Sequence, residues 1–251
     1  MEHLVETRET AWTRLVITRP AARNALNTAL LADLAATLQR LADTPGCRAI
    51  LLHGAEGNFA AGADIAEIET KSSSDATTDP RKAYWAAIRA FPKPLVAAVE
   101  GFALGGGLEL ALMADLLVAG PTARMGLPET NLGLIPGAGG GQRLMARIGP
   151  ARAARMVLTG EVIDAPTAFA WGLASHLAQN AVAEAATLTA KLADRAPLAL
   201  MAAKAALVAG AESALALAQE RRAFESLLDT ADKAEGIRAF REKRKPGFTG
   251  K

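Results

Sequence analysis

The sequence predicts an α/β protein with a helical C-terminal region. Short apolar runs of strand length alternate with helical patterns in the first half, and glycine-rich turns follow several of these runs. From about Ala151 onward the chain is mostly alanine- and leucine-rich, which indicates helices, with breaks expected at Pro197 and Gly210. Since 51% of the 251 residues are hydrophobic, the chain can bury a substantial core.

Strands and helices are expected to alternate from the start of the chain. The alternation from Trp12 to Thr18 and the apolar run from Arg48 to His53 each predict a strand. Between them an amphipathic helix is expected, with Asn27 as its N-cap and Pro45-Gly46 beyond its end. Its apolar face is formed by leucines three to four residues apart: Leu30, Leu34, Leu38 and Leu41.

The next part of the chain continues this alternation. The segment Lys71 to Pro80 is rich in serine and threonine and predicts a loop before a helix from Arg81 to Phe91. A buried strand is expected at Pro94 to Val99, then a helical segment at Leu108 to Met113 and a strand at Asp115 to Ala119.

Charge and cysteine content exclude several classes of protein. The 28 basic and 26 acidic residues are mixed along the chain, so we expect neither nucleic acid nor a membrane surface as a partner. Only Arg238 to Lys251 is locally basic. We expect no signal peptide in Met1 to Arg14 and no membrane span later. The single cysteine, Cys47, excludes an internal disulfide and favours a reducing compartment, so we expect a cytoplasmic protein.

Three neighbourhoods combine glycine with a functional side chain. They are Phe59 to Asp64, Leu104 to Glu109, and Pro128-Glu129 followed by Pro136 to Gly141. The first two place small residues between a predicted strand and a predicted helix, where exposed backbone N–H groups favour negative charge. Two such N–H groups directed at one carbonyl oxygen would form an oxyanion hole, where each donor stabilises the transition state by about 3 to 4 kcal/mol. A polarised thioester would react at its α-carbon or conjugated double bond, and a carboxylate pair could move the protons.

Other interpretations of these residues stay open. Glycines after a strand more often form a tight turn than a catalytic site. A dinucleotide-binding loop is disfavoured because Gln142 stands where the third glycine of that motif belongs. Glu109 lies in an apolar helix, where a buried carboxylate is costly unless it is paired or functional, but it could instead face solvent or pair with an arginine. Glu129 taken alone is best explained as a surface residue.

Metal and nucleophile chemistry find little support. His3, His53 and His176 have no metal-ligand spacing, so no metal site is expected. The sequence contains no G-x-S-x-G motif and no P-loop, and Cys47 has no histidine near it in the sequence. We therefore expect that thiol to be inert.

Taken together and in order, the motifs resemble the signature segments of the crotonase superfamily of enoyl-CoA hydratases and isomerases. The matching segments are Arg19 to Leu26, Phe59 to Asp64, Leu104 to Glu109, Gly126 to Glu129, Leu132 to Gly140, Glu235 to Phe240 and Lys243 to Lys245. The resemblance implies a spiral of ββα units over residues 1–190. It also implies a C-terminal helical oligomerisation region over residues 191–251 that builds a homotrimer or a dimer of trimers.

The resemblance also implies roles for individual residues. The N–H groups of Ala63 and Gly106 would form the oxyanion hole. Glu109 would be the general base and Glu129 the general acid in adding water to a 2-enoyl-CoA, which would be the partner. Further contacts to the substrate are implied for Ala60, Ala61, Asp64, Ile65, Gly137, Phe240 and Lys243, the last two from a neighbouring subunit. No cofactor is implied, because coenzyme A is part of the substrate.

Hydratases of this family carry both glutamates, whereas isomerases and hydrolases often lack one. An isomerase of the same fold and a non-catalytic acyl-CoA or RNA-binding relative remain alternatives. Within the family, Arg19 to Leu26, Pro197 to Leu200 and Pro246 to Phe248 resemble hydratases of aerobic phenylacetate breakdown, whose substrate has a second carboxylate. That carboxylate would need a cation in the acyl pocket. The candidates are Lys71, Arg81, Lys82 and Arg89.

Overall fold

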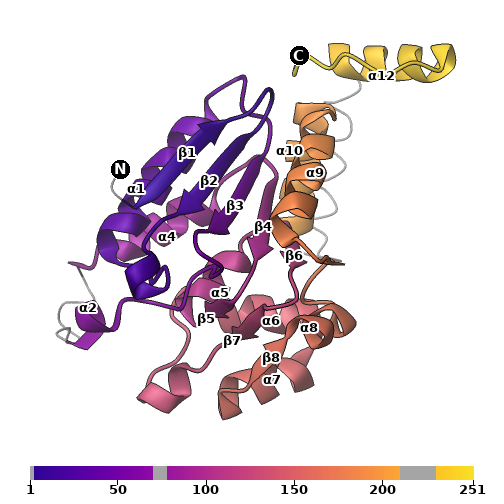
Figure 1. Cartoon of the computed structure of the whole chain (residues 1–251). Coiled ribbons are helices and arrows are strands. Elements are labelled where there is room, and N and C mark those ends of the chain that lie inside the picture. Colours follow the sequence, from indigo (N-terminus) through magenta and orange to yellow (C-terminus); the bar gives the residue numbers. More distant parts are fainter. Residues whose placement is uncertain (1–2, 70–77, 210–229) are drawn as a thin grey trace.

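The computed structural model describes residues 3–69, 78–209 and 230–251 (Figure 1). Its described strands form a six-stranded sheet of order β1-β2-β3-β4-β6-β9 and a three-stranded sheet of order β5-β7-β8. The strands of the larger sheet are β1 (Leu4–Arg8), β2 (Thr13–Ile17), β3 (Ile50–Gly54), β4 (Leu95–Val99), β6 (Leu116–Ala119) and β9 (His176–Leu177). Those of the smaller sheet are β5 (Phe102–Leu104), β7 (Arg124–Gly126) and β8 (Val162–Asp164).

The central strands of the larger sheet, β3 and β4, are buried on both faces. Its strands are parallel except for the antiparallel pair β1 and β2, and all five residues of β4 are buried. Ile50 and Leu52 pack into the main core, whereas Leu51 between them packs into a second core. This alternation follows from the two-residue period of a strand, and it requires a helical layer on each face.

The helices supply those two layers. They are α1 (Thr28–Ala42), α2 (Ile65–Glu69), α4 (Arg81–Arg89), α5 (Gly106–Ala111), α6 (Gly140–Ile148), α7 (Pro150–Thr159), α8 (Ala165–Trp171), α9 (Ala181–Ala193), α10 (Pro197–Ala209) and α12 (Ala231–Glu242), with 3-10 helices η1 (Pro20–Ala22) and η2 (Glu129–Leu132). Figure 1 shows α1 and α4 on one side of the sheet and α9 on the other, with α12 at the periphery. No described helix combines the length and apolar character needed to cross a bilayer.

Helix α1 forms as its sequence predicts. The Asn27 side chain accepts a hydrogen bond from the Leu30 N–H at 2.9 Å, which confirms the predicted N-cap. The four leucines of the predicted apolar face are all buried in the main core. Buried Lys93 donates to the carbonyl oxygens of Leu41 and Thr44 at the C-terminal end, where a cation is favoured.

Some expected boundaries are wrong. The stretch after residue 151 is not helical throughout, because β8 pairs with β7 and β9 pairs with β6 within it. Strands of two or three residues are too short to show a two-residue period, so the sequence pattern does not reveal them. Helix α5 begins at Gly106 rather than Leu108. Most of the expected loop from Lys71 to Pro80 lies outside the described residues.

Helix α9 is fixed to the sheet at its N-terminus. The side chains of Asn180 and Glu100 accept hydrogen bonds from the N–H groups of Ala183 at 2.9 Å and Ala181 at 3.0 Å. Buried Ala181 and Ala185 then pack on the second core. The expected boundary between a core and a C-terminal region, at residue 190, falls inside this helix.

Candidate active site

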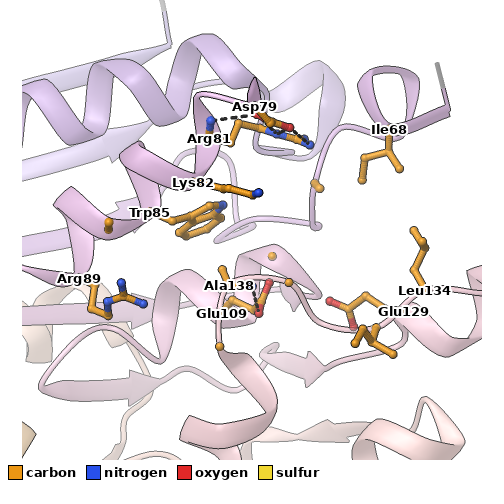
Figure 2. A pocket seen from close by; sticks show the side chains of 16 residues that line it. Ile68, Asp79, Arg81, Lys82, Trp85, Arg89, Glu109, Glu129, Leu134 and Ala138 are labelled. Atoms are coloured by element: carbon orange, nitrogen blue, oxygen red, sulfur yellow. Dashed lines mark hydrogen bonds and ion pairs between the residues drawn. The ribbon is translucent and has the colours of Figure 1, made fainter. Parts of the chain in front are cut away.

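A cavity of about 620 Å³ lies between α4 on one side and α5, η2 and the loop before α6 on the other (Figure 2). Of the residues expected at a catalytic site, it is lined by Ala63, Gly106, Glu109, Glu129 and Gly137. These residues come from three separate parts of the chain. The fold therefore joins all three glycine-containing neighbourhoods around one space.

Backbone pairing brings Ala63 and Gly106 together. The segment before Ala63 is held by hydrogen bonds from Ala60 N–H to Phe102 O at 2.8 Å and from Leu104 N–H to Ala60 O at 3.1 Å. A Cβ atom on Gly106 would lie 3.5 Å from the Ala63 nitrogen. Gly106 is the first residue of α5, so its N–H has no partner within the helix. Within the described chain neither N–H donates a hydrogen bond, and both face the same cavity.

Glycine is required at two positions beside this pair. Gly105 has φ +49°, and a Cβ atom there would lie 3.1 Å from Glu129 Oε1. At Gly107 a Cβ atom would lie 2.0 Å from the Ala60 carbonyl oxygen, which no backbone contact tolerates. These glycines allow α5 to start against the segment that ends at Ala63.

Glu109 is held by the loop before α6. Its side chain is 4% exposed, and its Oε1 accepts hydrogen bonds from the N–H groups of Ala138 at 2.7 Å and Gly140 at 2.8 Å. Among the described residues Glu109 has no ion pair, so the solvent-facing and arginine-paired alternatives are both wrong. The two donors orient a buried carboxylate towards the cavity.

Glu129, the first residue of η2, lines the same cavity as Glu109, on the side opposite α4 (Figure 2). The interpretation of Glu129 as a simple surface residue is wrong, because its Oε2 is buried and has no hydrogen-bond partner within the described structure. Burial raises the pKa of this carboxyl group, and the negative charge of Glu109 adds to the increase. A half-buried carboxyl group with a raised pKa and one buried oxygen without a partner is suited to proton transfer.

Several residues implied as substrate contacts do not line this cavity. Ala60 is fully buried, and its backbone N–H and carbonyl are both used in pairing with β5. Asp64 pairs with Arg19 at 3.0 Å, while Ile65 is 56% exposed on α2. The remaining three are half-buried Ala61, exposed Lys243, and Phe240, whose side chain lies outside the described part. Their contacts with a substrate stay predictions.

The cavity also has walls that the motifs did not reveal. From α4 they are Arg81, Lys82, Trp85, Ala86 and Arg89, and from elsewhere Ile68, Asp79, Leu134, Ile135, Ala138 and Gly139. The α4 residues follow a three- and four-residue spacing, so a helical-face analysis would have placed them together. Sequence alone does not show that this face of α4 lies opposite Glu109.

The residues with metal or nucleophile potential lie apart from this cavity. His53 is half-buried, and this burial lowers its pKa. Cys47 is 1% exposed, and burial raises the pKa of its thiol, which fits an inert cysteine. No group of three or more metal-binding side chains occurs in residues 3–69, 78–209 and 230–251.

The fold and these two carboxylates define an enzyme class. The sequence model of the enoyl-CoA hydratase/isomerase family matches residues 8–251, so the chain belongs to that family. It is 46% identical to the 2,3-dehydroadipyl-CoA hydratase of Escherichia coli K12, over 100% of both chains. It is 41% identical to a probable enoyl-CoA hydratase of Mycobacterium tuberculosis (strain CDC 1551 / Oshkosh), over 94% of this chain and 93% of that protein.

Solved structures agree with the sequence comparison. An enoyl-CoA hydratase of Geobacillus kaustophilus superposes with a TM-score of 0.94 at 37% identity, over 99% of this chain and 98% of that one. The enoyl-CoA hydratase of Bacillus anthracis gives a TM-score of 0.93 at 33% identity, over 99% and 100%. The expected crotonase-type α/β fold is confirmed, and the chain is an enzyme of the enoyl-CoA hydratase kind.

Proposed function

We propose that the enzyme adds water across the 2,3 double bond of a 2-enoyl-CoA thioester to give a 3-hydroxyacyl-CoA. One observation carries the proposal: Glu109 and Glu129 line the same cavity as the adjacent N–H groups of Ala63 and Gly106. Relatives named as hydratases at 41 to 46% identity support this reaction.

The two N–H groups would bind the thioester carbonyl oxygen. Attack at C3 moves electron density from the double bond through C2 to that oxygen, so negative charge develops where the donors point. Preorganised donors stabilise such charge more in the transition state than in the ground state. Because Ala63 and Gly106 are fixed by backbone pairing and by the start of α5, little reorganisation is needed during reaction.

The two glutamates would divide the proton transfers. Glu109 accepts a proton from water as the water oxygen forms its bond to C3, and Glu129 donates a proton to C2. One water O–H bond and the π bond break, one C–O and one C–H bond form, and a later proton exchange restores both carboxyl groups. The raised pKa of Glu129 favours the protonated form that a donor needs.

The same proposal extends to substrate, assembly and location. The name of the Escherichia coli relative supports a substrate like 2,3-dehydroadipyl-CoA, which has a second carboxylate. Coenzyme A enters as part of the substrate, and no cofactor is needed. The enzyme would form a homotrimer or a dimer of trimers in the cytoplasm. Ile135 and Leu158, which are 76% and 74% exposed, support burial in some subunit interface. In that assembly, helices in residues 191–251 would mediate contacts, with Phe240 and Lys243 near a neighbour's coenzyme A.

The test is to follow the ultraviolet absorbance of the conjugated thioester of crotonyl-CoA with the wild type and the Glu109→Ala and Glu129→Ala variants. We expect rapid loss with the wild type and at least about a 100-fold lower rate in each variant. Full activity in both variants would refute the assignment. Faster use of a 3-enoyl-CoA, with one glutamate dispensable, would instead identify an isomerase.

A further inference from the structure

One face of α4 forms a wall of the cavity and has a cation at each end. The face is formed by residues that follow one another at helical spacings of three, one and three positions: Lys82, Trp85, Ala86 and Arg89. Figure 2 shows the Arg89 side chain directed from α4 towards the part of the cavity that holds Glu109. Positive charge therefore lies beside the catalytic carboxylates, where the reaction itself does not need it.

The two cations differ from a third one in the same wall. Arg81 is already neutralised by Asp79, with Nε at 3.0 Å and Nη2 at 2.8 Å from the same Oδ2. Neither the Lys82 nor the Arg89 side chain forms an ion pair or a hydrogen bond with any described residue. These two are thus the cavity cations that remain available to a bound anion.

Arg89 also reaches a second cavity. This cavity, of about 720 Å³, shares Arg89, Gly137 and Gly139 with the first, so the two spaces adjoin at these residues. Gly137 and Gly139 flank Ala138, whose N–H holds Glu109. A chain that runs past Glu109 and away from the oxyanion hole therefore meets Arg89.

The second cavity is cationic as well. Its described lining includes Arg143, Arg147 and Lys204, with Asp115 as the only acidic residue. Asp115 pairs with Lys204 at 2.9 Å, while Arg143 and Arg147 donate to backbone carbonyl oxygens. Burial lowers the pKa of Arg143, and the like charge of Arg89 lowers it further, so these two cations repel each other. An anion between them would relieve that repulsion.

We propose that Arg89 is a specificity-determining residue that binds a carboxylate at the far end of the acyl chain, and so selects dicarboxylic 2-enoyl-CoA substrates. The inference rests on the proposed hydratase function for the placement of the acyl chain. A planar guanidinium can bind a carboxylate through two parallel hydrogen bonds, whereas an ammonium is a point charge. Lys82 lies two helical turns away, beside Asp79 and Arg81, and outside the second cavity.

Binding of saturated thioesters tests this residue without any reaction. Calorimetry with adipyl-CoA and hexanoyl-CoA compares six-carbon chains with and without the distal carboxylate. The wild type should bind adipyl-CoA at least about tenfold more tightly, and Arg89→Gln should lose that preference. Lys82→Gln is the matched control because it removes a cation from the same helix face, and it should keep the preference.

Three binding results would overturn the inference: no preference in the wild type, a retained preference in Arg89→Gln, or a loss of the preference in Lys82→Gln alone. Measuring the hydration of 2,3-dehydroadipyl-CoA and 2-hexenoyl-CoA distinguishes a failure of the Arg89 inference from a failure of the proposed hydratase function. Hydration of both at equal kcat/KM would remove the role of Arg89 and leave the reaction in place. Hydration of neither, with the Arg89-dependent binding preference intact, would remove the reaction and support the carboxylate site.

Discussion

Replacing Gly140 with alanine should disable Glu109 while leaving the glutamate itself in the sequence. A Cβ atom at residue 140 would lie 2.7 Å from Glu109 Cγ and 2.9 Å from its Oε1, closer than carbon contacts allow. The Gly140 N–H also donates to Oε1 at 2.8 Å, so the methyl group and the hydrogen bond cannot both keep their places. Glu109, the loop, or both must move.

The expected magnitude follows from that contact. Losing one hydrogen bond to a buried carboxylate costs about 1.5 to 3 kcal/mol, which corresponds to a rate factor of about 10 to 150. A displacement of about 1 Å at a catalytic group costs about 100-fold. We therefore expect kcat for crotonyl-CoA hydration to fall by about 100-fold, measured by loss of the enoyl absorbance.

Gly141→Ala is the matched control. Residue 141 is the next one in α6, and a Cβ atom there would meet no atom within 4 Å. Both substitutions raise helix propensity equally, so the difference between them isolates the contact with Glu109. If Gly140→Ala hydrates crotonyl-CoA as fast as Gly141→Ala while circular dichroism shows intact folding, the reasoning about Glu109 is wrong.

Three further outcomes are expected. Because the pKa of Glu129 is raised by folding, the native state binds the Glu129 proton more tightly than the unfolded chain does. The free energy of unfolding therefore falls as the pH rises from the ordinary carboxyl pKa through the raised one. The Glu129→Gln variant should then have a higher melting temperature than the wild type at about pH 8 and the same melting temperature at about pH 4. An equal difference in melting temperature at both pH values would contradict this. Asn24→Ala should lower the free energy of unfolding by about 3 kcal/mol in urea, because fully buried Asn24 donates to Ala55 O and Asn58 O and accepts from Arg19 N–H. Leu34→Ala should lower the free energy of unfolding by about 3 kcal/mol in the same assay, since Leu34 is fully buried. A loss under about 1 kcal/mol would show that neighbouring side chains collapse into the space left by Leu34.

Local patterns in the sequence were enough to predict much of the fold. The leucine spacing and Asn27 predict α1 and its start, because a helix cap and an apolar face depend on residues close in the chain. The run from Pro94 to Val99 predicts β4 because a strand covered on both faces is apolar throughout. The strands β8 and β9 carry no such signal, since they are short and are defined by partners far away in the sequence.

The candidate site divides in the same way. From the sequence by itself, the glycine-containing neighbourhoods singled out Glu109 as a candidate, and the family resemblance predicted the roles of Glu109 and Glu129. Only the tertiary structure decided that Ala138 and Gly140 hold Glu109, that burial raises the pKa of Glu129, and that Arg89 lies at the junction of two cavities. Residue types and local spacing are properties of the chain, whereas burial, charge interactions and contacts between distant segments arise only when the layers pack.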